Sequence, residues 1–371
     1  MPAISTSAAA LTPSWAQRMW RATDNVLTRA LATPLAVDDY LQWFNPLWSS
    51  RTIRAEVVAV QRETPSVTTI SLRPNAHWPG HRAGQHVLLT VQCDGVRHSR
   101  CFTIASGEQE PLLRLTIKAH EQGLVSREVL ERMRDGDLVE LSAPQGEFLL
   151  PEGDGPLLMI CGGSGITPML SMLRTLAAAG QQRDVVLVHY YSTAAEALAV
   201  EELAVLAAQW PQLRSLGCCT REAGQGLNGG RFSLAQLQAL VPDAAARQWL
   251  LCGPAGLMDA VQQASVEAGV APPLSERFEL SPPTVVGEGE VHFARSAVSA
   301  DGEQGGSLLE LAEQAGLTPR YGCRMGICQA CKCHVDSGLV RDLRTGEVRE
   351  VRNESVQICV HAPAGPVQVQ L

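Results

Sequence analysis

Five of the eleven cysteines lie between positions 323 and 359, with a spacing that could hold a metal. Cys323-x4-Cys328-x2-Cys331 forms a compact triplet, and Cys359 follows after 27 intervening residues. Thiolates are the soft ligands that iron–sulfur clusters require, and this spacing is typical of a plant-type [2Fe–2S] site. Zinc is the main alternative, but zinc sites usually pair two short knuckles. We therefore predict four iron ligands, and we interpret Cys333 as a core cysteine.

A glycine-rich segment could bind a dinucleotide. Residues 161–168, CGGSGITP, join an apolar strand to an expected helix. Glycines allow the backbone to approach a pyrophosphate, and the helix dipole favours its charge, while Pro168 suits the first helical turn. Cys252-Gly253-Pro254 ends the last expected strand of the same region. A buried structural cysteine is the alternative interpretation of Cys252.

The segment Arg100-Cys101-Phe102-Thr103 ends another expected strand. Alternation along a strand places Arg100 and Phe102 on one face and Thr103 on the other. The pattern is common by itself, and a surface ion pair could explain the arginine. Its position at a strand end, just before a region of alternating strands and helices, gives it more weight.

These segments must be positioned by at least two kinds of domain. Residues 51–150 contain six short strand-like runs and one helix, at Leu124–Met133, which predicts an antiparallel β-barrel. Residues 151–280 alternate strands with helices, including one predicted over Ala195–Trp210, and this predicts a parallel sheet. Residues 285–371 form a small third unit, and residues 1–50 are predicted as a helical N-terminal extension.

The composition narrows the classes of function. The net charge is -8, which gives no reason to expect a nucleic acid partner. No apolar stretch is long enough for a membrane helix, and the odd cysteine count argues against a disulfide framework. Residues 1–36 faintly resemble a transit peptide, but we expect a protein of the reducing cytoplasm that carries a metal cluster.

Taken together, the motifs resemble the ferredoxin–NADP reductase superfamily, in the form that carries a C-terminal plant-type ferredoxin domain. The resemblance covers residues 51–371 and implies a β-barrel flavin domain, an α/β nucleotide domain and a β-grasp ferredoxin domain. It implies that Arg100 binds the flavin pyrophosphate, Phe102 stacks on the isoalloxazine and Thr103 bonds near flavin N5. The family's usual tyrosine is phenylalanine here, so a phenol hydrogen bond is lost.

The resemblance extends to further site residues. A second flavin segment matches residues 117–119 and 123–126, and the nicotinamide ring is expected against Cys252, with Glu276 and Phe278 near the flavin. Thr103 and Cys252 are the implied catalytic residues. The other implied cofactor-binding residues are Lys118, Gly123, Val125, Ser126, Gly162, Gly163, Gly165, Thr167, Pro168, Gly253 and Pro254.

The implied reaction passes a hydride from NAD(P)H to a flavin, after which single electrons leave through the [2Fe–2S] cluster. FAD is favoured over FMN by the overall match. NADPH is favoured over NADH because Thr220, Arg221 and Arg231 could bind a 2′-phosphate, and no acidic residue ends the second strand of this domain. A terminal oxygenase acting on its own substrate and a redox sensor are the rival classes.

The electron acceptor is expected to be a separate terminal oxygenase or desaturase. Residues 39–49 followed by the barrel resemble the reductase components of bacterial acyl-CoA desaturase systems, which implies a membrane-bound di-iron desaturase and peripheral contact at the inner membrane face. A soluble Rieske-type oxygenase is the alternative. Arg320, Arg324 and Lys332 flank the cysteine loop and would favour an acidic docking face.

Overall fold

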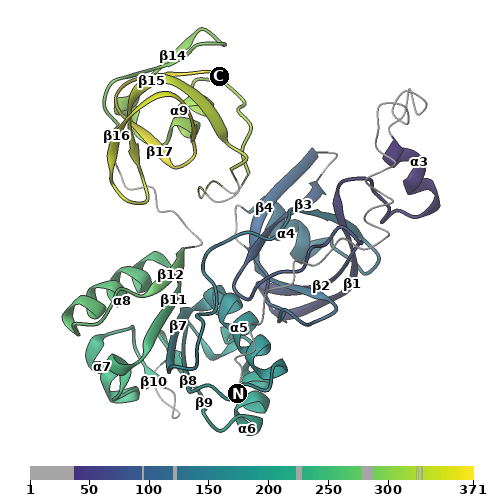
Figure 1. Ribbon diagram of the computed structural model, residues 1–371, viewed down its shortest axis with the longest axis vertical. Helices are drawn as coiled ribbons and strands as arrows, with labels where there is room; N and C mark the ends of the chain where they lie inside the picture. Colours follow the sequence, from purple (N-terminus) through teal and green to yellow (C-terminus); the bar gives the residue numbers. More distant parts are fainter. Residues whose placement is uncertain are drawn as a thin grey trace, which may run out of the picture.

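Three β-sheets organise the chain in a computed structural model, which describes residues 37–93, 96–119, 123–222, 228–277, 287–322, 324, 326 and 329–371. Figure 1 shows the three bodies in chain order, with the barrel in blue, the parallel sheet in teal and green, and the C-terminal sheet in yellow. The expected combination of an antiparallel, a parallel and a mixed sheet is confirmed. Among the described residues, no helix has the length and apolar character to cross a membrane.

The first sheet has six antiparallel strands in the order β4-β3-β6-β1-β2-β5. A bridge between Ile104 and Leu115 joins the two outer strands. Inward positions alternate along each strand and bury a core that includes Val57, Leu89 and Ile117. The elements are β1 Ile53–Thr64, β2 Val67–Pro74, β3 His86–Cys93, β4 Val96–Thr103, β5 Leu113–Lys118, α4 Leu124–Glu131 and β6 Leu138–Leu141.

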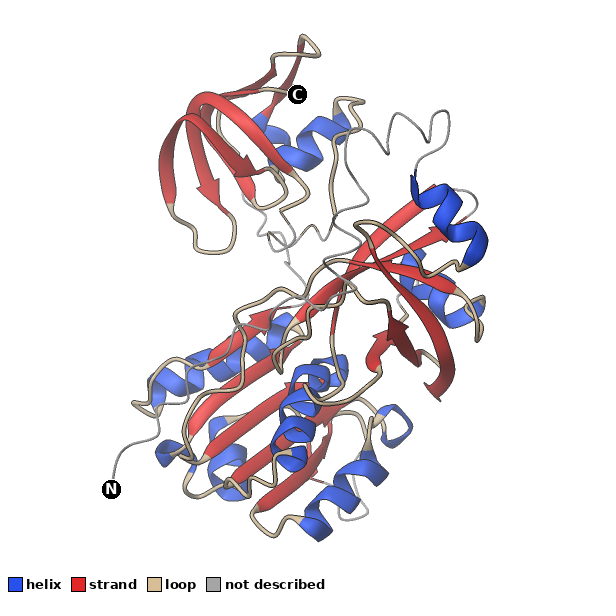
Figure 2. Cartoon of the chain, turned by 45° about the vertical axis from the view of Figure 1, so that its right-hand side comes forward, coloured by secondary structure: helices blue, strands red, loops and turns tan. Residues whose placement is uncertain are grey.

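The second sheet is parallel, in the order β10-β9-β8-β7-β11-β12, and helices cover both of its faces (Figure 2). Strands β7 and β8 are buried along their whole length because helices pack on each side. The strands are β7 Leu157–Gly162, β8 Val185–Tyr191, β9 Leu213–Cys219, β10 Asn228–Gly229, β11 Gln248–Gly253 and β12 Leu274–Arg277. The helices are α5 Ile166–Ala178, α6 Val200–Gln209, α7 Leu234–Leu240 and α8 Ala255–Glu267.

One helix prediction in this domain is wrong in its extent. The helix expected over Ala195–Trp210 is a short 3-10 turn at Ala194–Glu196 followed by α6. The two are separated because Ala199, at the N-cap of α6, adopts φ 56°, a left-handed conformation that interrupts a right-handed helix. Strands β10 and β12 were not anticipated from the sequence.

The C-terminal sheet has five strands in the order β14-β13-β17-β15-β16 and is packed on the helix α9. The helix begins with a capping box, in which Ser307 and Glu310 each bond the other's backbone amide. Its bounds and those of the strands are α9 Leu308–Gln314, β13 Glu290–Phe293, β14 Val298–Asp301, β15 Lys332–Asp342, β16 Val348–Gln357 and β17 His361–Val369. Before the barrel, α3 spans Val37–Phe44, and the helical pattern expected further upstream lies outside the described residues.

Candidate functional site

The glycine-rich loop and the Cys252 segment, which are ninety residues apart in sequence, pack directly on each other. Strands β7 and β11 are parallel neighbours, with Cys161 opposite Cys252. A Cβ on Gly165 would stand 2.3 Å from the carbonyl oxygen of Cys252, so the helix can begin here only on a glycine. Gly162 and Gly253 face each other in the same way, with Pro254 against Gly162. The two predicted motifs therefore form one structure at the carboxyl edge of the sheet.

The start of α5 is buried and internally bonded. The Thr167 hydroxyl donates to the carbonyl oxygen of Ser164 at 3.0 Å, and Thr167 and Pro168 are both buried in the first turn. Gly163 has φ +52°, a conformation that favours glycine, and the space above its Cα is open. The loop thus presents backbone amides at a helix N-terminus, which is a favourable place for a phosphate.

His189 supports this loop from β8. Its Nε2 lies 3.1 Å from the carbonyl oxygen of Gly163, and its ring meets Tyr191 edge to face. Burial lowers the pKa of His189 to about 4, so the imidazole is neutral at pH 7 and donates through Nε2. The sequence interpretation did not include this residue.

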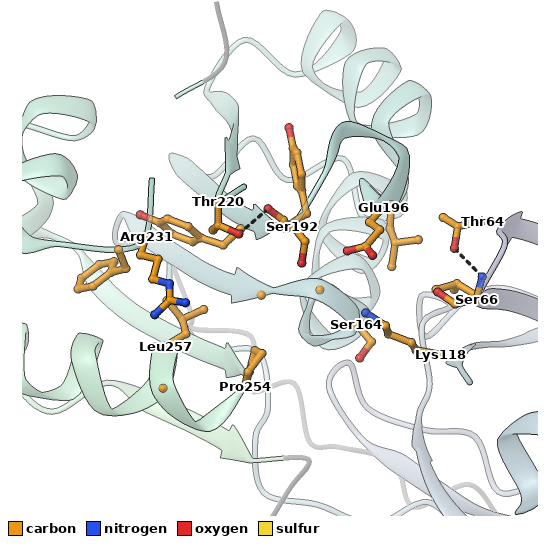
Figure 3. A pocket seen from close by; sticks show the side chains of 18 of the residues that line it. Thr64, Ser66, Lys118, Ser164, Ser192, Glu196, Thr220, Arg231, Pro254 and Leu257 are labelled. Carbon is orange, nitrogen blue, oxygen red and sulfur yellow. Dashed lines mark hydrogen bonds between the residues drawn. The ribbon is translucent and has the colours of Figure 1, made fainter. Parts of the chain in front are cut away.

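A cavity of about 380 Å³ opens between the barrel and the parallel sheet (Figure 3). Lys118 and Ser66 from the barrel form one side, and Gly162, Gly163 and Ser164 from the loop lie beside them. Its remaining lining comes from the barrel edge and the nucleotide domain: Thr64, Val67, Tyr190, Tyr191, Ser192, Glu196, Leu198, Thr220, Arg231, Phe232, Pro254, Gly256, Leu257 and Ala260. Its position at the carboxyl ends of parallel strands is where such sheets bind ligands.

The three residues predicted to select NADPH are not equivalent in the structure. Thr220 and Arg231 line the cavity, and Figure 3 shows the Arg231 guanidinium on the side away from Lys118. Arg221 is exposed and is not among the lining residues, while its backbone amide bonds Ser192. Of the two arginines, Arg231 therefore lines the cavity and Arg221 does not.

The predicted flavin residues lie on adjoining parts of the barrel. Strand pairing sets Phe102 opposite Val87, on the face of the barrel core, and Thr103 opposite His86, on the other face. Thr103 is buried, whereas Phe102 is half-buried and packs at the edge of the core. Arg100 points its Nη1 to the carbonyl oxygen of Ser99 at 2.8 Å. Gly123 precedes α4, where Val125 and Ser126 are buried.

Two of the four predicted iron ligands can be placed. The sulfur atoms of Cys331 and Cys359 lie 3.1 Å apart, both thiols are buried, and the distance is far longer than a disulfide bond. Cys323 and Cys328 lie outside the described residues, as does Phe278. Two soft donors that converge from separate segments fit an iron–sulfur cluster.

The loop before Cys331 is held by neighbouring strands. The carbonyl oxygen of Gly326 accepts a hydrogen bond from Gln357 at 2.6 Å, and Gly326 has φ +72° with Val360 packed against it. Cys333 is different, because its thiol lies 3.4 Å from the carbonyl oxygen of Gln370, on the side of the sheet core. This placement agrees with its interpretation as a core cysteine.

The cysteine loop also meets the barrel. Two guanidinium groups lie over the ring of Tyr321, that of Arg324 at 4.0 Å and that of Arg100 at 6.0 Å from the ring centroid. Arg324 is paired with Glu313 of α9, so one cation belongs to the ferredoxin unit and the other to the barrel. The residue predicted to bind the flavin pyrophosphate is therefore next to the cluster loop.

Comparisons with known proteins agree with this architecture. Residues 55–149 match the family model described as an oxidoreductase FAD-binding domain, and residues 159–263 match an oxidoreductase NAD-binding domain. Residues 291–364 match a 2Fe-2S iron-sulfur cluster binding domain. The expected cofactors, FAD, NAD(P)H and one [2Fe–2S] cluster, are thereby confirmed.

Relatives match over nearly the whole chain. An NADPH oxidoreductase of Mycobacterium tuberculosis is 38% identical over 93% of this chain and 91% of its own length. The NADH oxidoreductase HCR of Escherichia coli is 30% identical over 84% and 95%, and one component of the 1,2-phenylacetyl-CoA epoxidase of the same organism is 30% identical over 76% and 86%. The chain therefore belongs to the ferredoxin–NADP reductase superfamily, as an NAD(P)H-dependent FAD reductase with a C-terminal [2Fe–2S] domain.

Proposed function

We propose that the protein takes electrons from NADPH and delivers them singly to a membrane-bound di-iron acyl desaturase. The observation that carries the proposal is that an FAD-binding, an NAD-binding and a 2Fe-2S cluster binding domain lie together on one chain. FAD supplies the step between a hydride and single electrons when it is bound. The chain's own residues then have to hold the cofactors and bring the cluster domain to its partner.

The proposed roles of the site residues follow their positions. Arg100 and the N-terminus of α4 at Gly123 would bind the flavin phosphates, and Phe102 would cover the ring system. Thr103 is buried on the face toward the nucleotide domain, where its hydroxyl would orient the reacting edge. Cys252 is fully buried at the end of β11, and burial together with the neighbouring Glu276 raises its thiol pKa well above the usual value. A thiol that stays protonated is a poor nucleophile, so it could contact the nicotinamide ring without reacting with it.

Selection of NADPH is proposed to depend on Arg231. The relatives include both an NADPH and an NADH oxidoreductase, so the coenzyme has to be argued from the site. Arg231 and Thr220 stand on one side of the cavity, and an arginine binds a 2′-phosphate with two parallel hydrogen bonds. Glu196 also lines this cavity, and its carboxylate would repel a phosphate placed beside it. A bound 2′-phosphate would therefore depend on the positive charge of Arg231.

A kinetic comparison of two arginines tests the coenzyme assignment. Arg231→Ala should lower kcat/KM for NADPH about tenfold or more, since a hydrogen bond to a charged group contributes about 1.5–3 kcal/mol, and should change NADH little. Arg221→Ala, at an exposed position outside the cavity wall, is the matched control and should change neither. Equal losses for both coenzymes in Arg231→Ala would refute the 2′-phosphate role.

Three observations support a membrane-bound acyl desaturase as the acceptor. The segment 39–49 resembles reductases of acyl-CoA desaturase systems, and one relative is a component of an epoxidase named for a coenzyme A thioester. In α3, Trp43 is 72% and Phe44 81% exposed, and aromatic side chains favour the membrane interface. We therefore propose that the protein acts at the cytoplasmic face of the membrane as a peripheral component.

Reconstitution tests the acceptor. The purified reductase, NADPH and a candidate desaturase in lipid vesicles should convert a saturated acyl-CoA to the unsaturated product. Replacing Trp43 and Phe44 with serine should weaken co-sedimentation with vesicles while leaving cytochrome c reduction intact. If the desaturase yields no product and a soluble Rieske-type oxygenase is reduced efficiently, the desaturase assignment is wrong and the Rieske-type oxygenase is the acceptor.

A further inference from the structure

A hairpin turn of the ferredoxin domain is docked beside the cysteine loop. The turn joins β15 to β16 and spans residues 343–347. The backbone amide of Leu343 donates to the carbonyl oxygen of Val360 at 2.8 Å, and Val360 directly follows the predicted iron ligand Cys359 in the chain. The turn is thereby fixed against the segment that carries one of the cluster sulfurs.

Arg344, in this turn, places its guanidinium against the cysteine loop. Its Nη1 lies 3.5 Å from the carbonyl oxygen of Gly326, a contact at the limit of hydrogen-bond distance. A Cβ on Gly326 would stand 3.0 Å from the same Nη1, so the guanidinium packs on the loop backbone. Hydrogen bonds to Asp342 raise the pKa of Arg344, and the nearby Cys359 sulfur raises it further. The guanidinium is therefore a permanent positive charge close to the cluster ligands.

Asp342 fixes the orientation of this guanidinium. Its Oδ1 accepts hydrogen bonds from the backbone amide of Arg344 at 2.8 Å and from Nε at 3.0 Å, and its Oδ2 accepts one from Nη2 at 2.6 Å. Two parallel bonds of this kind hold a planar guanidinium firmly. Nε and Nη2 form one edge of the group and Nη1 points the other way, so the carboxylate is on the side away from the cysteine loop.

The hydrogen bond that the loop carbonyl needs is already supplied by an uncharged side chain. Gln357 donates through Nε2 to the carbonyl oxygen of Gly326 at 2.6 Å, which is much shorter than the contact from Arg344. Arg324 belongs to the loop itself, but its guanidinium pairs with Glu313 of α9. What Arg344 adds at the loop backbone is therefore charge, and its hydrogen bonds are spent mainly on Asp342.

We propose that the pair of Asp342 and Arg344 tunes the midpoint potential of the [2Fe–2S] cluster, with Arg344 raising the potential and Asp342 limiting the rise. When the cluster is loaded, one electron leaves the reduced flavin and the oxidised cluster gains it, so the cluster becomes more negative by one charge. A fixed cation stabilises that added charge, and the charge around a cluster is one of the factors that set its potential. A higher potential favours both the arrival of the electron from the flavin and its retention until the acceptor binds.

Potentiometric titration of the purified holoprotein tests this inference, with cluster and flavin followed by absorbance. Arg344→Gln should lower the ratio of reduced to oxidised cluster at a fixed applied potential about three- to tenfold, which is roughly 30 to 60 mV for one electron. The shift is moderate because Arg344 is 39% exposed and solvent screens its charge. Arg344→Lys retains the charge and should keep most of the wild-type midpoint. Asp342→Asn keeps an oxygen for the turn but removes the negative charge, so it should shift the midpoint in the opposite direction.

A matched control separates a local charge from the net charge of the chain. Arg352→Gln removes the same unit of charge from β16, where the side chain is 76% exposed and pairs with Glu350, and it should leave the cluster midpoint nearly unchanged. The flavin midpoint, read in the same titration, should be the same in every variant. A chelation assay of iron content shows whether each variant carries its cluster. If Arg344→Gln binds no iron, the direction of the shift in Asp342→Asn decides the matter.

Three results would overturn the inference. One is an unchanged cluster midpoint in Arg344→Gln with its iron intact, or in Asp342→Asn. The others are a shift in Arg344→Lys as large as in Arg344→Gln, and a shift of Asp342→Asn in the same direction as Arg344→Gln, because the shape of the loop and not the charge would then be responsible. The titrant supplies the electrons, so neither coenzyme selectivity nor the identity of the acceptor enters, and failure here is distinguishable from failure of the proposed function.

Discussion

The flavin domain has two internal boundaries, and they are built differently. Toward the nucleotide domain it is joined by hydrogen bonds that are buried or partly buried: Ser171 donates to the carbonyl oxygen of Ser106 at 2.7 Å, and Arg174 donates to that of Ala105 at 2.5 Å. Toward the ferredoxin domain, the described residues include the contact of the Arg100 guanidinium with the Tyr321 ring, and Tyr321 is 37% exposed.

The difference matches the demands of the two transfers. Hydride transfer requires two rings to be held in close and specific geometry, and misplacement by about 1 Å can cost orders of magnitude in rate. A buried, hydrogen-bonded boundary provides that precision. A lightly attached domain can instead move relative to the rest, which suits a cluster that has to meet both the flavin and an external acceptor.

The largest expected effect is loss of the cluster without loss of the flavin unit. Cys359→Ser should abolish iron–sulfur absorbance and nearly all cytochrome c reduction, while flavin content and ferricyanide reduction persist. Absorbance spectra and the two acceptor assays measure this. Cys333→Ser, at a thiol that contacts Gln370, is the matched control and should keep the cluster. Loss of flavin from Cys359→Ser would show that the two boundaries are not independent.

Acid should lower the unfolding free energy of the nucleotide domain, because His189 is buried there. Its folded pKa of about 4 is below the unfolded value of about 6.5, so its unfavourable contribution is absent above pH 6.5 and grows as the pH falls to about 4. There it reaches about 3 kcal/mol of unfolding free energy. His189→Gln keeps a donor to Gly163 and should lose less stability over this range in urea unfolding. Parallel pH curves for the two proteins would contradict this; the exposed His292→Gln is the control.

Breaking the nucleotide-side boundary should have a smaller but clear effect. Arg174→Ala removes the bond to Ala105 and the pair with Glu202, and should lower the unfolding free energy by about 2 kcal/mol, since Glu202 is about a third exposed. Flavin reduction should slow with it. Arg127→Ala, which removes an exposed pair with Glu131, should cost less than about 0.5 kcal/mol. Similar losses of unfolding free energy in the two variants would contradict the idea that Arg174 stabilises the boundary between the two domains.

The smallest effect on stability is expected at the ferredoxin side. Tyr321→Leu should change the unfolding free energy by less than about 1 kcal/mol, which is the scale of an exposed cation–π contact. It should nevertheless slow electron transfer from flavin to cluster several-fold in stopped-flow experiments, with flavin reduction unchanged. Tyr321→Phe retains the ring and should restore the rate. An unaffected rate in Tyr321→Leu would mean that the stack does not guide the cluster domain.

Much of the architecture was predictable because its signals are local in the chain. The alternation of Val87, Leu89 and Val91 marks a barrel strand, and the four-residue spacing between Cys323 and Cys328 marks a cluster loop. The glycines of residues 162–165 predicted a dinucleotide loop because they let the backbone approach a pyrophosphate. The structure adds that Gly165 is also required by its close approach to Cys252. Strand β12 was missed because its four residues are too short to show periodicity.

The sequence by itself determined the three cofactor units and their order, since these depend on spacing within short segments. Only the tertiary structure decided which arginine lines the cavity, because Arg221 and Arg231 are chemically alike and differ only in the path of the chain around them. It alone paired His86 with Glu276, 190 residues apart, and set Tyr321 beside Arg100. Such contacts arise from the packing of whole domains against one another, and no local pattern of residues encodes that packing.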